Sequence, residues 1–162
     1  MYCDSEKWDK RYLALAQHVA TWSKDPQTQV GCVIVNCNGG IVACGFNGFP
    51  HGHDDSPELY LDAKHKILNC VHAEDNALRI ANIPRYETGA RLYVTFPPCT
   101  RCAQLIADYS QIKKVVYLAP NHEKIRAERG EQYLVDLLVL NNIAFEILHK
   151  ANIFLKAMVL DE

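Results

Sequence analysis

Two short motifs contain the residues of this chain whose types and spacing could do chemistry. His72 and Glu74 stand two positions apart in VHAEDNA, and Cys99 and Cys102 form the C-x-x-C of PPCTRC. One imidazole and two thiolates can give zinc three protein ligands and leave its fourth tetrahedral position to water. Glu74 is close enough to His72 to exchange a proton with that water without binding the metal. The four residues together predict nucleophilic hydrolysis at a zinc ion.

Each motif taken alone has a plainer interpretation. A histidine or glutamate at a helix start is usually a capping residue or a charge that the helix dipole favours. A C-x-x-C is also typical of a thiol–disulfide pair or of half a structural zinc site. A structural site needs a second ligand pair, for which the sequence offers only His51 and His53, and a redox pair leaves His72 and Glu74 unexplained. A zinc-stabilised binding module without turnover, in which Glu74 is dispensable, stays open as an alternative.

The elements that must position these residues can be read from hydrophobic spacing, β-branched runs and Gly or Pro turns. The predicted helices are 8–22, 57–68, 72–82, 99–110 and 131–142, with an optional last helix at 152–160; the predicted strands are 28–36, 41–47, 90–96, 113–120 and 143–149. This order predicts an α/β fold with a mixed sheet and helices on its faces. The two motifs then begin two helices separated by one strand, so their side chains can converge at one edge of the sheet.

Composition limits the class of protein. A chain of 162 residues suits one domain, residues 1–162. With 17 basic and 19 acidic side chains and a net charge of −2, it has no strong electrostatic reason to bind long nucleic acid. The first ten residues show no apolar segment of a secretory signal, and no stretch approaches the roughly 20 apolar residues of a membrane span. We therefore expect no membrane association, a cytoplasmic location and reduced thiols for the seven cysteines.

Beyond the metal motif, the sequence resembles the deoxycytidylate (dCMP) deaminase family of the cytidine deaminase superfamily. The signature H-x-E…P-C-x-x-C is that of zinc deaminases, in which the glutamate is not a ligand. The resemblance is good over about residues 8–118, and the segments that carry it are WSKDPQTQVGCVIVN (22–36), IVACGFNGFPHGHDD (41–55), VHAEDNA (71–77) and RLYVTFPPCTRCAQLI (91–106).

The resemblance implies a three-layer α/β/α cytidine deaminase-like fold with a mixed five-stranded sheet. It implies hydrolysis of dCMP to dUMP with release of ammonia, which supplies dUMP for thymidylate synthesis. By position, His72, Cys99 and Cys102 would hold Zn2+ and Glu74 would carry protons. A homo-oligomer, in many members a hexamer, is implied, as are dCTP and dTTP as effectors.

The substrate contacts expected from the resemblance lie beside the metal motif. Asn47 would lie near the sugar, and the backbone of Ala73 would face the pyrimidine ring. The strand-end segment containing Thr95, Phe96 and Pro98 flanks the expected metal, where α/β sheets tend to bind ligands. Asn47 can also be read as a turn former, and Phe96 equally well as a core aromatic.

Several alternatives stay open. The charged segment 119–130 differs from the family's pattern; Lys124, Arg126 and Arg129 could bind a phosphate or form a solvated helix face. A second metal, for which His51, His53, His65 and Cys70 offer material without compact spacing, is less expected. The enzyme could instead act on another cytosine nucleotide or nucleoside, including 5-modified dCMP, or on adenosine in tRNA. The near-neutral charge argues against tRNA.

Overall fold

The computed structural model of the chain describes residues 5–160. The first four residues, Cys3 among them, lie outside the described residues. The predicted absence of a signal segment rests in part on these residues. The helices are α1 (Glu6–Ala20), α2 (Pro57–Leu61), α3 (Ala63–Asn69), α4 (Ala73–Ile80), α5 (Thr100–Asp108), α6 (His122–Arg129) and α7 (Glu131–Lys150); the strands are β1 (Gly31–Val35), β2 (Ile41–Phe46), β3 (Ala90–Val94), β4 (Ile112–Leu118) and β5 (Phe154–Met158).

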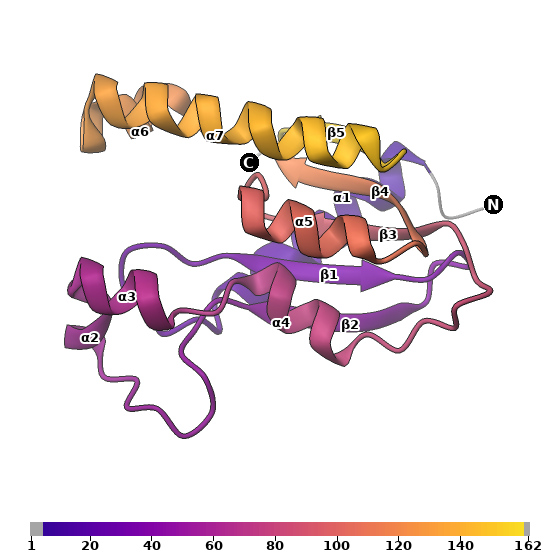
Figure 1. Cartoon of the computed structure of the whole chain (residues 1–162), viewed down its shortest axis with the longest axis horizontal. Helices are drawn as coiled ribbons and strands as arrows, with labels where there is room; N and C mark the ends of the chain where they lie inside the picture. The colour runs from indigo at the N-terminus through magenta and orange to yellow at the C-terminus, as the bar shows by residue number, and fades with distance from the viewer. Residues whose placement is uncertain (1–4, 161–162) are drawn as a thin grey trace.

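The five strands form one mixed sheet in the order β2-β1-β3-β4-β5, which confirms the prediction (Figure 1). β1 pairs antiparallel with both β2 and β3, whereas β3 and β4, and β4 and β5, pair in parallel. In the chain, β3 lies between α4 and α5. Both helices therefore begin at the same end of the strands, the end at which β3 finishes. The turn between β1 and β2 and the segment 81–89 lie at the opposite end (Figure 1).

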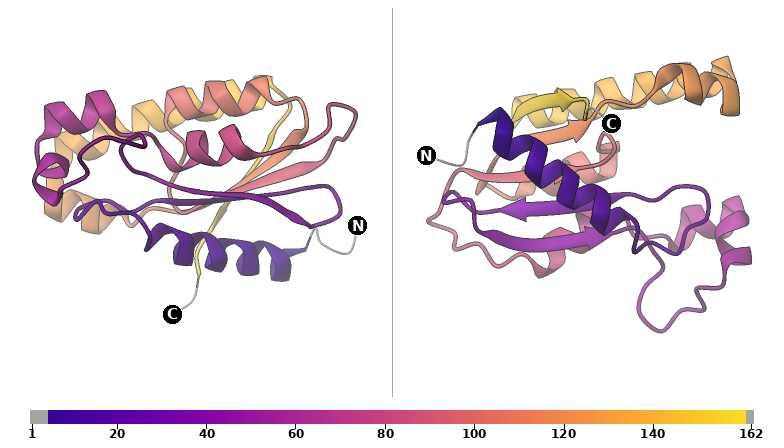
Figure 2. Two further views of the ribbon diagram at one scale, coloured as in Figure 1. Left: turned by 90° about the horizontal axis from the view of Figure 1, so that it is seen from below. Right: turned by 180° about the vertical axis from the view of Figure 1, so that it is seen from behind.

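Helices cover both faces of the sheet, so the fold has the predicted three layers (Figure 2). On one face α1 packs through Leu13, Ala16 and Val19 against alternate residues of the strands, including Val33 and Tyr93. On the other face α4, α5 and α7 pack on a second cluster that contains Ile34, Leu92, Val115 and Leu148. β1 and β3 are buried along their whole length, as expected for strands covered on both faces.

The prediction of a strand at 143–149 and of a last helix at 152–160 is wrong. Residues 143–149 belong to α7, because Ala144 and Leu148 continue the buried helical stripe that Leu134 and Asn141 begin. The helix ends where Asn152 adopts a φ of 57°, a conformation that asparagine tolerates. The residues after it form β5, whose Val115↔Leu155 and Val116↔Lys156 register adds a parallel edge strand to β4.

Two further segments differ from the predicted elements. The single helix predicted at 57–68 is divided into α2 and α3 at Asp62, whose side chain accepts a hydrogen bond from the backbone N–H of His65 and so starts α3. The charged segment 119–130 contains α6, which Asn121 caps by accepting from the N–H of Lys124. Within residues 5–160, no helix combines the length and the apolar character that crossing a membrane requires.

A buried carboxylate fixes α1 to the sheet. Asp9 is fully buried and accepts hydrogen bonds from the Tyr93 hydroxyl at 2.8 Å, from Lys114 Nζ at 2.9 Å and from Lys156 Nζ at 2.8 Å. These donors come from β3, β4 and β5. Burial alone would raise the pKa of Asp9, but the hydrogen bonds from Lys156, Lys114 and Tyr93 outweigh it and leave that pKa below its ordinary value.

Asp9→Asn is therefore expected to destabilise the fold in a pH-dependent way. A carboxyl with a lowered folded-state pKa stabilises the fold above its unfolded pKa of about 3.9 and loses that contribution as pH falls through the folded value. At pH 7 the free energy of unfolding should fall by about 1.5–3 kcal/mol, the range for hydrogen bonds to a charged group, since two partly buried ammonium groups lose this carboxylate. The difference from the unmodified chain should shrink in acid. Urea unfolding at pH 7 and pH 3.5 measures both values.

Glu6→Gln is the control for this prediction. Glu6 also lies on α1, but its ion pair with Lys10 is solvent-exposed, so its loss should change the free energy of unfolding by less than about 1 kcal/mol. Equal stabilities of Asp9→Asn and the unmodified chain at pH 7 would show that the buried ion pairs contribute nothing.

Candidate metal and active site

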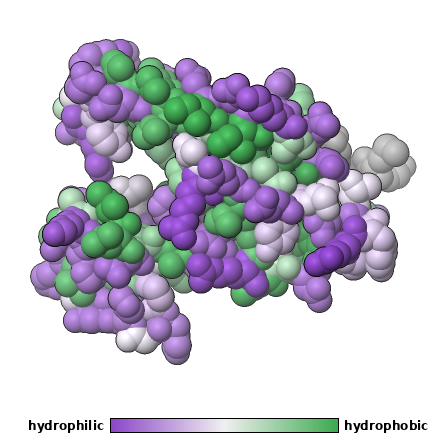
Figure 3. Space-filling model, in the orientation of Figure 1, coloured by the Kyte–Doolittle hydropathy of each residue, from purple (hydrophilic) through white to green (hydrophobic). Residues whose placement is uncertain are grey.

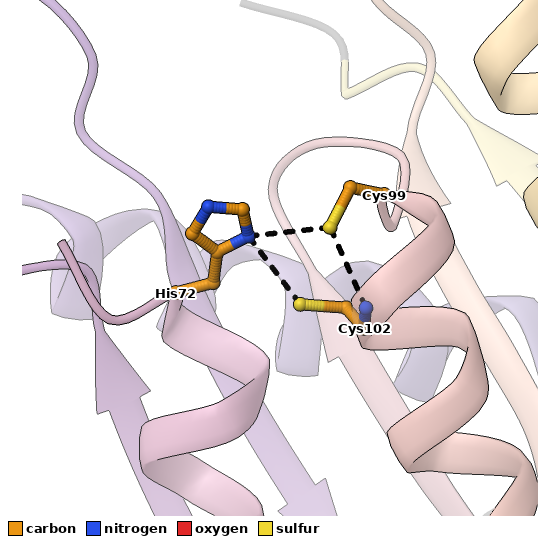
Figure 4. A group of neighbouring side chains, drawn as sticks. All are labelled: His72, Cys99 and Cys102. Carbon is orange, nitrogen blue, oxygen red and sulfur yellow. Dashed lines mark hydrogen bonds between the residues drawn. The ribbon is translucent and has the colours of Figure 1, made fainter. Parts of the chain in front are cut away.

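The structure brings the imidazole and the two thiols of the predicted zinc site together (Figure 4). His72 occupies the N-cap position of α4 without a side-chain capping bond, Cys99 caps α5, and Cys102 lies in the first turn of α5. His72 Nδ1 lies 3.3 Å from Cys99 Sγ and 3.4 Å from Cys102 Sγ. All three ligand atoms lie within 4.8 Å of one another, and they are the one such group of three or more found among residues 5–160.

These distances fit a zinc ion. Tetrahedral coordination with Zn–S of about 2.3 Å and Zn–N of about 2.1 Å places nitrogen and sulfur about 3.6 Å apart. The observed separations of 3.3 and 3.4 Å are close to that value. One nitrogen and two sulfurs are also the donors that zinc prefers, and a set of three protein ligands is typical of catalytic rather than structural zinc sites.

The position of His72 is set by close contacts between α4 and β2. A Cβ on Gly45 would lie 2.3 Å from the carbonyl oxygen of Ala73, so only glycine lets the start of α4 rest on this strand. Just before His72, Val71 and Gly48 form an isolated antiparallel bridge, with N–H to O distances of 2.8 and 3.1 Å. Asn76 then donates to the Phe46 carbonyl at 2.8 Å. The imidazole is thus carried by rigid backbone.

The two cysteines are held by the first turn of α5. Cys99 Sγ accepts a hydrogen bond from the backbone N–H of Cys102 at 3.4 Å, as an N-cap does (Figure 4). Hydrogen bonds from Cys102 and from His72 lower the pKa of Cys99 to about 4, and the neighbouring Cys99 thiolate raises the pKa of Cys102. The Cys99 hydrogen bond also raises the pKa of His72, against burial and against the nearby charge of Arg101. The cluster therefore already stabilises one thiolate, the form that binds metals.

Glu74 has the environment of a proton carrier. It lies in the first turn of α4 and is only 4% exposed. Burial raises the pKa of Glu74 to about 7, although its own backbone N–H and the charge of His72 oppose that shift. A carboxyl that titrates near neutral pH both accepts and releases protons readily, which is the property that general acid–base catalysis needs.

The four residues line one cavity of about 820 Å³. Its walls come from α2 and α3 on one side and from α5, α6 and α7 on the other, and Figure 3 shows the hollow between them. Of the predicted substrate contacts, Asn47, Ala73 and Phe96 line this cavity. Thr95 and Pro98 are not among its lining residues. Roles in substrate binding stay predictions for all five.

Asn47 and Thr95 also have contacts that hold the loops beside the cavity. The Asn47 side chain accepts from the N–H of Val30 at 2.8 Å and donates to the carbonyl of Thr28 at 2.8 Å. Thr95 Oγ1 accepts from the N–H of Gly31 at 3.0 Å, which joins the end of β3 to the start of β1. Asn47 therefore shapes the cavity wall even before a ligand is considered, whereas Thr95 fixes the end of β3 without lining the cavity.

The structure shows where the residues considered for phosphate binding and for a second metal lie. Arg126 bonds Glu123 and Glu131, and neither it nor Lys124 lines the cavity, whereas Arg129 does. His51, His53, His65 and Cys70 belong to no ligand group of three within the described part of the chain. The cavity also contains residues that sequence analysis missed as site candidates, among them Arg101, Tyr133 and Asn141.

A family comparison agrees with this geometry. The cytidine and deoxycytidylate deaminase zinc-binding region matches residues 6–119 of the chain. The chain belongs to the cytidine and deoxycytidylate deaminase family. This deaminase is therefore a zinc-dependent enzyme of the hydrolase class, which confirms the predicted family and the Zn2+ cofactor.

Three relatives are similar in sequence to this deaminase over most of its length. It is 38% identical over 141 residues to an uncharacterized deaminase of Aliivibrio fischeri, covering 87% of this chain and 92% of that one. It is 42% identical over 125 residues to a probable deoxycytidylate deaminase of Caenorhabditis elegans, covering 72% of this chain and 60% of that one. With the Homo sapiens deoxycytidylate deaminase it shares 36% identity over 126 residues, covering 74% and 68%.

Solved structures agree on the fold. The dCMP deaminase from the cyanophage S-TIM5, determined in complex with dCMP and dUMP, aligns with a TM-score of 0.65 at 22% identity over 95% of this chain and 98% of that one. At this level of identity the likeness supports the fold. The predicted cytidine deaminase-like architecture is thus confirmed.

Proposed function

We propose that this deaminase hydrolyses dCMP to dUMP and ammonia at a zinc ion held by His72, Cys99 and Cys102, with Glu74 as the proton carrier. The observation that carries the proposal is the burial of the Glu74 carboxyl beside three ligand atoms that lie within 4.8 Å of one another. Relatives named deoxycytidylate deaminase, such as the human protein at 36% identity, support dCMP as the substrate.

The proposed chemistry assigns successive proton transfers to Glu74. When bound, zinc would supply Lewis-acid activation of a water molecule, whose pKa it lowers to about 7. Glu74 Oε takes a proton from the water that attacks C4 of cytosine and gives it to N3. It then transfers the second proton of that water to the 4-amino group, which leaves as ammonia. Water and cytosine thereby become uracil and ammonia, with no other reactant.

The substrate contacts follow from the cavity walls. Asn47 is assigned to the deoxyribose, the backbone of Ala73 to the polar edge of the ring, and Phe96 to the face of the pyrimidine. Thr95 and Pro98 are assigned a supporting role, because they lie one and two positions from Phe96 in the chain without lining the cavity. Asn47 is 5% exposed, and its oxygen has a second lone pair for a ligand hydroxyl.

The test is a deamination panel with dCMP, CMP, dCTP, deoxycytidine and 5-modified dCMPs, measured as ammonia release. We expect dCMP to be the best substrate by kcat/KM. Preference for a 5-modified dCMP would keep the chemistry and change the substrate. Absence of turnover of every monophosphate by protein shown to contain zinc would overturn the proposal.

Assembly, regulation and location are further parts of this proposal. We propose a homo-oligomer, since α7 and α3 expose Val139, Leu140, Ile67 and Leu68 by more than half (Figure 3). A hexamer is the state that the resemblance implies. We assign dCTP and dTTP as effectors to a second cavity of about 470 Å³ beneath the 48–55 loop. A cytoplasmic location fits the six described cysteines, all of which are free. There the product dUMP would supply thymidylate synthesis.

A further inference from the structure

Asn141 is a polar residue in an apolar seam. It lies on α7 between the buried residues Leu134 and Ala144, where the helix packs on α5. Its side chain is only 6% exposed, and no hydrogen bond or ion pair joins it to another side chain or backbone group among residues 5–160. Its amide atoms are not among the fully buried unsatisfied atoms of the described residues, so they stay accessible to a ligand. Asn141 also lines the cavity that contains the zinc ligands.

Arg101 is the cation of this cavity that has no partner of its own. Four basic side chains line the cavity: Lys66, Arg79, Arg101 and Arg129. Lys66 Nζ lies 2.6 Å from Asp25, Arg79 makes two hydrogen bonds to Asp75, and Arg129 lies over the Tyr133 ring. Arg101 is exposed at the cavity, and no described carboxylate or ring pairs with it.

The place of Arg101 in the chain makes its charge unusual. It stands between the two cysteine ligands, in the first turn of α5. The N-terminus of a helix already carries partial positive charge, and the neighbouring Cys99 thiolate offsets only part of it. The positive charge of Arg101 therefore adds to the partial positive charge that the helix dipole places in this turn.

We propose that Arg101 and Asn141 bind the 5′-phosphate of the substrate, so that α5 and α7 form the subsite by which this enzyme selects a nucleoside monophosphate. This inference rests on the proposed function. A guanidinium donates two parallel hydrogen bonds to phosphate oxygens, and an amide N–H donates a third. Phosphate would supply both the missing counter-ion of Arg101 and the missing partner of Asn141.

The test compares dCMP with deoxycytidine, which lacks the phosphate. Arg101→Ala should raise KM for dCMP by about 10- to 100-fold and Asn141→Leu by about tenfold, with kcat nearly unchanged. Neither should change kcat/KM for deoxycytidine by more than about twofold. Calorimetric titration of the zinc-loaded proteins with dUMP and deoxyuridine gives the same comparison without turnover.

Two controls sharpen the assignment. Arg126→Ala removes a guanidinium that is paired outside the cavity, and it should leave KM for dCMP unchanged. Arg101→Lys keeps the charge but loses the paired donors, so it should recover only part of the affinity. The inference is overturned if either Arg101→Ala or Asn141→Leu affects the phosphorylated and unphosphorylated compounds equally. Failure of the unmodified enzyme to process dCMP would instead overturn the proposed function.

Discussion

Glu74→Gln is expected to abolish deamination while leaving the zinc in place. Glutamine has nearly the same shape, so α4 and the buried position of residue 74 should persist, but it cannot accept the proton of water or deliver it to the leaving amine. The loss of general acid–base catalysis should lower kcat by about 100- to 10,000-fold. Ammonia release measures the loss, and mass spectrometry of the metal content should still give one zinc per chain.

The adjacent carboxylate provides a matched control. Asp75 follows Glu74 on α4, but its oxygens bind the Arg79 guanidinium at 2.8 and 3.1 Å. Asp75→Asn should therefore keep most of the turnover. If Glu74→Gln remained fully active on every pyrimidine tested, the proton-carrier role would be wrong. If the unmodified chain bound nucleotides but released no ammonia, a zinc-stabilised binding module would be the better description.

Cys102→Ser is expected to remove both the metal and the activity. The Cys102 sulfur is buried beside His72 Nδ1, and a serine hydroxyl is a much poorer zinc ligand than a thiolate. Loss of a ligand should weaken zinc affinity by more than about 100-fold, the upper range for losing an outer-shell partner. Metal analysis after dialysis should give less than a tenth of a zinc per chain, and Tm should fall because the ion no longer joins α4 to α5.

Cys70→Ser is the control for the metal prediction. Cys70 lines the same cavity but lies outside the ligand group, so its variant should retain one zinc and its turnover. Removing zinc from the unmodified enzyme with a chelator should abolish turnover, and adding zinc back should restore it. A Cys102→Ser protein that still held one zinc after dialysis would contradict the ligand set.

The grouping of the proposed zinc ligands and Glu74 could be predicted from the sequence because their geometry is local. His72 and Glu74 share the first turn of one helix, and Cys99 and Cys102 share that of the next. Backbone geometry fixes each pair, and the single strand β3 between the helices fixes how the pairs meet. The mixed sheet was predictable for the same reason, since alternation and turn residues are local signals.

The end of α7 could not be predicted in this way. Residues 143–149 are rich in β-branched and aromatic side chains, which favour a strand locally. What makes them helical is the packing of Ala144 and Leu148 against the rest of the molecule, a tertiary effect. Asn141 illustrates the same limit. No local signal marks it as a site residue, and only the packed structure shows that it lines the cavity with the zinc ligands.

The segment 81–89 offers a practical opening for protein engineering. It joins the end of α4 to the start of β3 at the edge of the sheet away from the zinc ligands (Figure 1). Tyr86 in this segment is 88% exposed. An affinity tag or a fluorescent reporter inserted after Tyr86 would therefore sit a full strand length from the chemistry, and the enzyme could be immobilised there with its cavity facing free solution.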